Sequence, residues 1–335
     1  MSENSSRRDF LKKSFVGAAA TSAVLASPQV RAAATSPPVV PPAFENGMPV
    51  GKLGDRTVSR LFLGCNPVSG YSHARDLRYV SGLMRAYQSD EKVMDTWELC
   101  EELGINTLLS DPFEKPVRIM KRYRSERGGR MQWLSEVHPP KPYHDTSLAD
   151  MRENLKQVVD NRPDFLYVQG GIGDSFVMRG AVEELGELLE DMKATGLPSG
   201  IGSHSIETTK AVAAAGIPPD FFVKTYHSDD YWSATPEGER VEFNVDSGGE
   251  RDHDNIWDIR PEETRSVMGR IEAPWVAFKV LAAGALNPRQ AFRFAFEGGA
   301  DFICVGMFDF QLRDDVRIAK EVLSEVLDRT RPWRA

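Results

Sequence analysis

A strand, a helix and a second strand can be read in residues 164–203, DFLYVQGGIGDSFVMRGAVEELGELLEDMKATGLPSGIGS. Asp164–Gln169 is a short, continuous apolar run, which indicates a strand of a parallel sheet covered on both faces. Phe176–Ala194 has the apolar spacing of an amphipathic helix, and Gly196 follows it, where a left-handed backbone ends a helix tightly. With a further strand at Ser199–Ser203, the stretch predicts one βαβ unit.

The same pattern repeats along the chain on both sides of this unit. The other expected strands are Ser59–Cys65, Asn106–Ser110, Met131–Val137, Phe221–Tyr226, Trp275–Ala282 and Phe302–Gly306. The other expected helices are Asp90–Leu103, Leu148–Val159, Ile206–Ala215, Pro261–Arg270, Pro288–Glu297 and Gln311–Leu327. Eight such units predict an α/β fold, a closed (β/α)8 TIM barrel. The rival is an open doubly wound sheet, but no GxGxxG follows the first strand.

The first 34 residues have the features of a twin-arginine signal peptide. Arg7 and Arg8 lie in a basic segment, Phe15–Leu25 is a short apolar run, and Ala32–Ala34 offers a cleavage site. This apolar run is about half of the ~20 residues that a membrane span needs. Twin arginine is an address that the export machinery reads, so we expect export to the periplasm or beyond, with no stable membrane span after cleavage.

A Pro-rich linker at 35–49 then leads into one domain at 50–330, which carries a long polar segment at 228–260. Such an excursion follows the sixth strand, so it belongs to the face where barrels keep their chemistry. The formal net charge is −8, and the leader carries +3, which leaves −11 on the rest. An acidic body argues against nucleic acid as a partner. Three cysteines are too few for a disulfide framework.

Five short motifs lie in order along residues 50–330. They are Gly51–Gly54 with Val58–Gly64, Glu102–Asn106, Ile201–Ser205, Leu281–Leu286 and Val305–Met307 with Gln311, Leu312 and Val316. Together they resemble the aldo/keto reductase family: its opening hairpin and first strand, the junction before strand two, strand five, the loop after strand seven, and the last strand and helix. The resemblance implies an aldo/keto reductase-like barrel.

That resemblance also implies a catalytic tetrad of Asp, Tyr, Lys and His, which protonates a carbonyl while NADPH delivers hydride. The family's Asp falls on Leu109, with Asp111 two residues later, and its Tyr falls near Phe113. Its Lys falls on Glu136 and its His on Gln169. The tetrad is therefore not preserved as a set, and we expect a rebuilt active site.

The resemblance places cofactor-binding glycines at Gly284 and Gly306. However, Met307-Phe308-Asp309 stands where the family has a basic, phosphate-binding cluster. The sequence thus argues against NADP(H) while leaving it as an alternative cofactor.

Barrel enzymes take their catalytic groups from the carboxyl ends of the strands. Four expected catalytic residues stand at such ends: Asp111, Glu136, His204 and Lys279. The expected substrate-binding residues are Asn66, His73, Gln169 and Tyr226.

Three chemistries remain open for these groups. Glu136, His204 and His227 could hold a divalent metal, or the acidic and imidazole groups could act as general acid and base. As a third option, Lys224 or Lys279 could form a Schiff base with a carbonyl if burial lowers its pKa, although each could instead neutralise a carboxylate.

The leading hypothesis is an exported barrel enzyme that acts on a small polar, sugar-like or carbonyl substrate by metal-assisted or acid/base chemistry. The alternatives are an NADP(H)-dependent oxidoreductase with a divergent site and a non-catalytic barrel that binds a small molecule.

Overall fold

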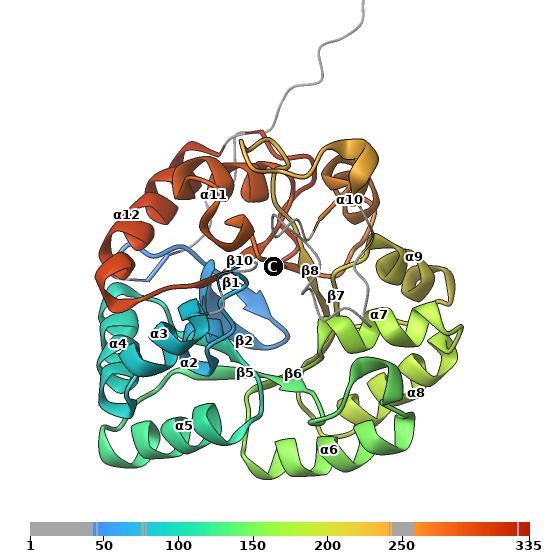
Figure 1. Cartoon of the computed structure of the whole chain (residues 1–335), viewed down its shortest axis with the longest axis horizontal. Coiled ribbons are helices and arrows are strands. Elements are labelled where there is room, and N and C mark those ends of the chain that lie inside the picture. Colours follow the sequence, from blue (N-terminus) through green and yellow to red (C-terminus); the bar gives the residue numbers. More distant parts are fainter. Residues whose placement is uncertain are drawn as a thin grey trace, which may run out of the picture. The chain divides into compact units, whose positions relative to one another are not determined.

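The computed structural model describes residues 43–44, 46–74, 77, 79–240, 242, 258–326 and 328–335. The expected leader at 1–34, most of the linker and residues 243–257 of the long segment lie outside the described residues. The described chain forms a ring of parallel strands surrounded by helices (Figure 1). Among the described residues, no helix combines the length and apolar character that crossing a membrane requires.

Eight parallel strands close into a barrel, as the sequence predicted. In the order in which they pair around the barrel, they are β3 (Leu61–Gly64), β4 (Thr107–Ser110), β5 (Gln132–Val137), β6 (Phe165–Val168), β7 (Ser199–Ser203), β8 (Phe221–Thr225), β9 (Trp275–Phe278) and β10 (Phe302–Gly306). The last strand pairs with the first, with Ile303 opposite Leu61, and this pairing closes the sheet. An open doubly wound sheet is therefore excluded.

Helices cover the outside of this barrel. The helices of eight residues or more are α3 (Tyr79–Tyr87), α4 (Asp90–Leu103), α5 (Glu114–Glu126), α6 (Leu148–Asp160), α7 (Gly170–Met178), α8 (Val182–Lys193), α9 (Ile206–Ala214), α10 (Pro261–Met268), α11 (Pro288–Glu297) and α12 (Asp309–Glu325). Shorter ones are α2 (Asn66–Ser69), η1 (Tyr143–Asp145), η2 (Glu237–Glu239) and η3 (Ala282–Gly284). Several begin at a capping side chain; for example, the Ser89 hydroxyl accepts the Lys92 N–H at the start of α4.

Three expected elements differ clearly from those observed. The expected helix Phe176–Ala194 is two helices, α7 and α8, because the chain turns at Gly180 with a φ of +75°. The expected strand Trp275–Ala282 ends at Phe278, since Lys279 has a φ of +57°. The expected strand Ser59–Cys65 begins at Leu61, and Ser59 ends the hairpin strand before it. Helices α2, α3 and α5 were not predicted.

An antiparallel hairpin, β1 (Val50–Leu53) and β2 (Arg56–Ser59), precedes the barrel. Its Leu53 and Val58 pack with the inner side chains of the strands, including Phe165 and Phe302. The hairpin thus fills the amino-terminal end of the barrel and leaves the carboxyl end, called the mouth below, as the face for chemistry.

Candidate active site

Strand alternation decides which side chains reach the inside of the barrel. On β5 and β6, Leu134 and Phe165 belong to the inner core, so Glu136 and Tyr167, two residues further on, also point inward. Cys304 reaches the interior from β10 in the same way, after Phe302. The inner core therefore ends, toward the mouth, in polar groups.

Glu136 is the centre of the first polar cluster at the mouth. The Tyr167 hydroxyl donates to Glu136 Oε1 over 2.8 Å, and His138 Nδ1 lies 2.9 Å from Oε2. Burial, followed by the charge of Glu136, raises the pKa of Asp111. A buried carboxyl group whose pKa is raised is a candidate general acid.

Asp111 is held in place by its own contacts. The Ser69 hydroxyl donates to Asp111 Oδ2 over 2.5 Å, and the Phe113 N–H donates to Oδ1 over 3.1 Å. Both contacts favour the ionised carboxylate and so lower its pKa. Burial and the charge of Glu136 raise the pKa by more than these contacts lower it. Asp111 is therefore suited to keep a proton longer than an exposed aspartate would.

Lys279 forms a second cluster with His73. Its Nζ lies 3.0 Å from His73 Nε2, and Asn66 Nδ2 lies 3.1 Å from the same nitrogen. Because two donors meet at Nε2, the neutral imidazole accepts there and carries its proton on Nδ1. Burial and then the charge of Lys279 lower the pKa of His73 well below its usual value, which agrees with a neutral ring.

Burial also lowers the pKa of Lys279 to about 7, and it does so against the opposing effect of Glu136. The amine is therefore neutral in a large share of molecules near neutral pH. Since the charge of Glu136 acts on Lys279, the two clusters lie on the same mouth of the barrel.

Unusual backbone conformations are concentrated around Lys279. Among the described residues, five non-glycine residues have positive φ: His73, Arg162, Lys279, Ala282 and Ala283. All of these except Arg162 lie beside Lys279 or in the loop that follows it. Left-handed backbone at non-glycine residues costs free energy and tends to persist at functional sites.

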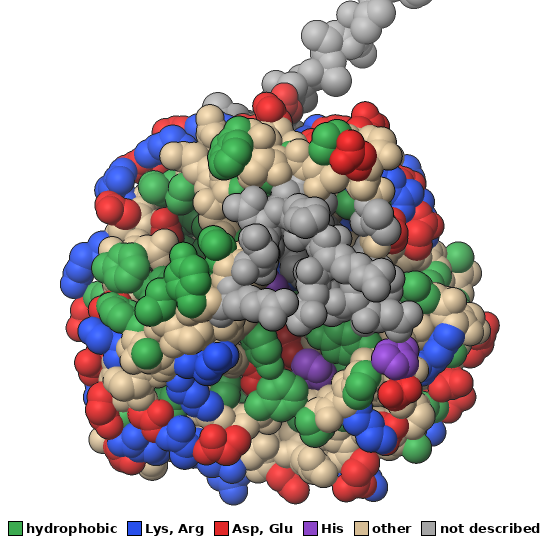
Figure 2. Space-filling view, in the orientation of Figure 1, with side chains coloured by type: hydrophobic (Ala, Val, Ile, Leu, Met, Phe, Trp, Pro, Cys, Tyr) green, Lys and Arg blue, Asp and Glu red, His purple; other side chains and the backbone are tan. Residues whose placement is uncertain are grey.

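A pocket of about 230 Å³ opens between the ends of β3, β9 and β10. Lys279, His73 and Asn66 line it, together with Gly284 and Gly306. The predicted residues Asn66, His73, Lys279, Gly284 and Gly306 are thus brought to one cavity. The space-filling view shows acidic, histidine and hydrophobic side chains next to one another near the centre of this face (Figure 2).

His204 is held by a buried carboxylate, Asp174, at the end of β7. Asp174 Oδ2 accepts the His204 backbone N–H over 2.8 Å and lies 3.1 Å from Nδ1. Burial lowers the pKa of His204, with Asp174 opposing the effect. The ring packs beside Phe278, with centroids 5.4 Å apart, so His204 faces the β9 side of the mouth.

Gln169 lies at the mouth but already has two contacts. Its Oε1 accepts the Ile172 N–H over 3.2 Å at the start of α7, and its Nε2 lies 3.4 Å from the Tyr143 hydroxyl. Its expected role in binding substrate stays a prediction.

Three expected site residues lie elsewhere. Outward-facing positions on β8 alternate with Phe221, Val223 and Thr225, so Lys224 and Tyr226 point into the helix layer. Tyr226 is fully buried against Trp275 and Phe294, which rules out the predicted contact with substrate.

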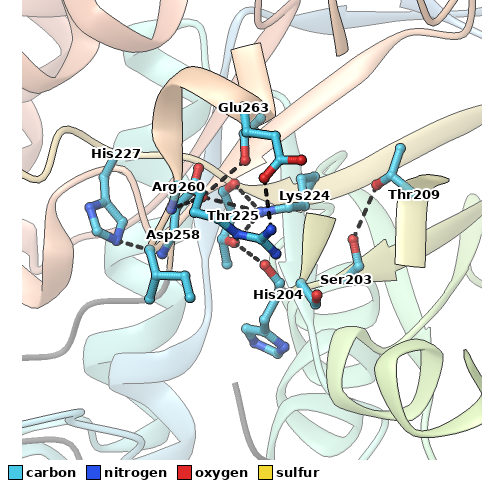
Figure 3. A network of polar contacts seen from close by, with 12 residues as sticks. Ser203, His204, Thr209, Lys224, Thr225, His227, Asp258, Arg260 and Glu263 are labelled. Carbon is cyan, nitrogen blue, oxygen red and sulfur yellow. Dashed lines mark hydrogen bonds and ion pairs between the residues drawn. The ribbon is translucent and has the colours of Figure 1, made fainter. Parts of the chain in front are cut away.

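Lys224 and His227 belong to a buried network under the start of α10, in which Thr225 Oγ1 donates to the His204 carbonyl over 2.9 Å (Figure 3). Lys224 Nζ donates to the Thr225 carbonyl over 2.8 Å and has no exposed surface, so it cannot meet a carbonyl substrate. His227 Nε2 accepts the Asp258 N–H over 3.1 Å, and its Nδ1 lies 2.9 Å from the Ser228 carbonyl. Both ring nitrogens of His227 are engaged away from Glu136.

The expected metal site is therefore wrong in its composition. Glu136 is bound to Tyr167 and His138, His204 to Asp174, and His227 to the Asp258 backbone. Across the part of the chain that the structure describes, no three His, Cys, Asp or Glu side chains are grouped so that they could hold a metal ion.

Two residues of the site were missed from the sequence. Tyr167 lies inside an apolar run. The inward direction of its side chain could have been predicted only by applying strand alternation to β5, starting from Glu136, and then extending it to the neighbouring β6. Asp174 was assigned to no element before the expected helix began at Phe176, and its link to His204 spans 30 residues of chain.

Comparisons with known proteins agree with the fold. The sequence matches no protein-family model and no curated protein. Among solved structures, a putative aldo-keto reductase from Pseudomonas aeruginosa is similar, with 19% identity, a TM-score of 0.55, and coverage of 82% of this chain and 94% of that one. An aldo-keto reductase from Bacillus halodurans in its holo form has 14% identity and a TM-score of 0.52, with coverage of 84% and 96%.

A variant of Gox0644 in complex with NADPH is similar at 11% identity and a TM-score of 0.50, with coverage of 84% of this chain and 94% of that one. At these identities the comparisons show the fold alone: an aldo/keto reductase-like barrel.

The described pocket does not fit NADP(H) well. Among its described lining residues, Lys279 is the one basic side chain, and its pKa is lowered to about 7. Asp309, in the first turn of α12, accepts from the Tyr87 hydroxyl and from Lys92 Nζ, so a carboxylate and not a basic side chain stands at the start of that helix. The volume of about 230 Å³ is also below the roughly 300–1,000 Å³ of pockets for drug-sized ligands.

Proposed function

We propose that this protein is an enzyme that moves protons at the carbon next to the carbonyl group of a small polar, sugar-like substrate. The observation that carries the proposal is Glu136, which lies at the mouth with hydrogen-bond partners on both oxygens and whose charge acts on the pKa values of Asp111 and Lys279. Isomerases and lyases use such sets of groups.

Each group has a role in this proposal. Glu136 removes or returns the proton on carbon, while Tyr167 and His138 hold its two oxygens. Asp111, which keeps a proton more readily than an exposed aspartate, donates to the developing oxyanion. Proton transfer by a positioned side chain contributes about 10²–10⁴-fold in rate. None of these steps requires a metal or a nucleotide.

Solvent exchange tests this function directly. Hydroxyaldehydes, hydroxyketones and 2-oxo acids are incubated with the protein in deuterium oxide, and NMR follows loss of the proton next to the carbonyl. We expect exchange with at least one class, reduced about 10²–10⁴-fold by Glu136→Gln. Glu153→Gln, on the exposed face of α6, is the matched control and should leave the rate unchanged.

Exchange that is equally fast in Glu136→Gln would contradict the proposal. Absence of exchange with all three classes, together with retained binding, would favour a non-catalytic binding barrel. The remaining alternative is an NADP(H)-dependent oxidoreductase, which the aldo/keto reductase-like fold supports. Oxidation of added NADPH in the presence of the same carbonyl compounds, or a nucleotide released from purified protein, would favour it.

The location of the protein relative to the cytoplasm is part of the same proposal. We place it outside the cytoplasm because residues 1–34 have the order of charge, apolar run and small residues of a twin-arginine leader. The export machinery is then a partner of the precursor, and the domain folds before it is exported.

A further inference from the structure

We propose that an exposed aromatic surface beside the pocket binds further sugar rings of the substrate, so that the substrate is a short saccharide chain instead of a single sugar. This inference rests on the proposed function, whose sugar-like substrate it makes more specific. Among the described residues, eight large hydrophobic side chains are exposed, and six of these lie between positions 71 and 87 or at Phe310. The surface, called the aromatic platform below, lies on α3 and the start of α12 and consists of Tyr79, Leu83, Tyr87, Phe308 and Phe310.

Helix α3 leaves its apolar face uncovered. It buries none of its nine residues, although Tyr79, Leu83 and Tyr87 recur at the spacing that places side chains on one face of a helix. Tyr79 is 65% exposed and Leu83 is 61% exposed. Figure 2 shows hydrophobic side chains next to one another on the side of the molecule where α3 and α12 lie. Exposed apolar surface that is gathered in one place is typical of a binding surface.

Contacts between the rings fix the aromatic platform. Phe308 and Phe310 stack with their centroids 5.4 Å apart, and Tyr87 meets both rings edge-on, at 5.6 Å and 6.1 Å. The Tyr87 hydroxyl donates to Asp309 Oδ1 over 2.6 Å, and Lys92 Nζ donates to Oδ2 over 3.1 Å. Because these contacts hold the rings before a ligand arrives, binding to them costs little conformational entropy.

The aromatic platform continues directly into the pocket. Phe308 lines the pocket, as do Met84 of α3 and Tyr71. Burial, and then the charges of Asp111 and Glu136, raise the pKa of Tyr71 to about 12, so this wall lies within electrostatic reach of the two carboxyl groups of the proposed function. Because the pocket measures about 230 Å³, the rest of a longer substrate would lie outside it, next to the aromatic platform.

The chemistry of the aromatic platform fits a sugar ring. One face of a sugar ring consists largely of C–H groups with a partial positive charge, and the face of an aromatic ring is negative. The hydroxyl groups of the sugar need polar partners, and Gln311 stands where the pocket and the platform meet. Its Oε1 accepts the Phe308 N–H over 3.0 Å, and its amide nitrogen, which has no hydrogen bond to the described residues, can donate to a hydroxyl. Tyr79 and Tyr87 are about 12 Å apart along α3, which gives room for more than one ring.

Binding measurements test the inference. The whole protein is titrated with cellotriose, mannotriose and xylotriose, each compared with its own monosaccharide, and calorimetry measures Kd. We expect at least one trisaccharide to bind about tenfold more tightly than its monosaccharide, and Phe310→Ser to remove most of that difference. Phe310 is 69% exposed, so its replacement should not disturb folding, and Phe310→Trp should keep the preference. Met178→Ser, which removes a similarly exposed apolar side chain at the end of α7, is the control and should keep it as well.

The outcomes separate this inference from the function on which it rests. Equal binding of all three trisaccharides and their monosaccharides, or a preference that Phe310→Ser leaves unchanged, overturns it. Binding of NADPH or adenosine that depends on Phe310 would assign the rings to a nucleotide, and a dimer that Phe310→Ser converts to a monomer in light scattering would assign them to a second copy; either result also overturns it. Trisaccharide preference without any proton exchange supports the aromatic platform and contradicts the proposed function, whereas Glu136-dependent exchange without that preference does the reverse.

Discussion

Lys279 is kept in the fold at an energetic cost. Burial lowers its pKa from 10.5 to about 7, so the folded protein binds this proton less readily than the unfolded chain does. Residues that work in an active site are often not those that would make the protein most stable.

This cost predicts how the stability of a variant depends on pH. Between pH 7 and 10.5 the unfolded chain holds the Lys279 proton and the folded chain releases it, so the contribution of Lys279 to the free energy of unfolding rises with pH through that window. Lys279→Met removes this dependence. We expect the variant to be more stable by about 2–4 kcal/mol at pH 7, a difference that shrinks toward pH 10.

Urea unfolding at the two pH values measures the difference, and groups common to both proteins cancel in the comparison. Lys156→Met on α6 serves as the control and should show no such trend. A Lys279→Met variant that is less stable than the natural protein at pH 7 would show that the lysine is a structural cation.

At the scale of elements, α7 is the helix that sets the position of His204. Asp174 on α7 accepts N–H groups of His204 and Ser205 and the hydroxyl of Thr208, so it ties α7 to the end of β7 and the start of α9. This contact needs a close approach between helix and strand. Gly173 makes it feasible, since a Cβ there would overlap the carbonyl oxygen of Gly202.

Two glycine-to-alanine changes test this packing. Gly173→Ala should lower the free energy of unfolding by about 2 kcal/mol or more, because backbone cannot move aside for the new methyl group. Gly82→Ala on α3 has open space around it and should stabilise by up to about 1 kcal/mol through helix propensity. Thermal unfolding measures the change in stability of both variants. Equal changes in stability would mean that α7 is not closely packed on β7.

Strand positions were predictable from the sequence, but which way a side chain points was predictable only in part. Continuous apolar runs between helices led to all eight strands, and strand ends led to Asp111, Glu136, His204 and Lys279. Tyr226 was wrong because consecutive residues at the end of β8 were treated as if they all faced the interior, whereas His227 was wrong because its ring contacts Ser228 and Asp258 beyond the strand. Alternation along a strand turns every second side chain outward.

The helix layer set other limits on prediction. The break between α7 and α8 depends on a left-handed turn at Gly180, and nothing in the apolar spacing marks it. The contacts of Asp174 with His204 and of Lys279 with His73 join residues 30 and 206 positions apart. Such pairs follow from the closure of the barrel, so a single sequence without the fold does not show them.

On the scale of the whole molecule, the carboxyl-terminal tail helps close the end of the barrel opposite the mouth. Buried Arg331 donates to Asp301 Oδ2 over 2.5 Å and to the carbonyls of Met268 and Ile271. Asp301 also accepts the Trp275 N–H at the start of β9. The tail therefore links the last two strands at their amino-terminal ends.

Loss of Arg331 should destabilise the whole domain. Arg331→Met leaves the buried Asp301 with a weaker partner, and breaking such a pair costs about 3–5 kcal/mol. Arg317→Met, in an exposed ion pair on α12, is the control and should change the free energy of unfolding by less than about 1 kcal/mol. Similar midpoints of urea unfolding for the two variants would contradict a role of the tail in closing the barrel.

The proposed export through the twin-arginine route is tested separately, on the whole chain. Changing Arg7 and Arg8 to lysines keeps the charge but alters the adjacent arginines that the twin-arginine machinery reads. We expect the variant precursor to accumulate in the cytoplasm in folded form, as shown by fractionation and protease resistance. A matched change of Lys12 and Lys13 to arginines should still be exported. Equal export of both variants would exclude this route.

The proposed site requires that Lys279 and Glu136 lie at the same mouth of the barrel and that the lysine loses its proton near neutral pH. NMR titration of 15N-labelled lysine side chains, with the Lys279 signal assigned by its absence in Lys279→Met, measures this directly. We predict a pKa near 7 for Lys279, which falls further in Glu136→Gln and is unchanged in Glu153→Gln. A Lys279 signal that titrates near 10.5 with the surface lysines, or that does not respond to Glu136→Gln, would contradict the account.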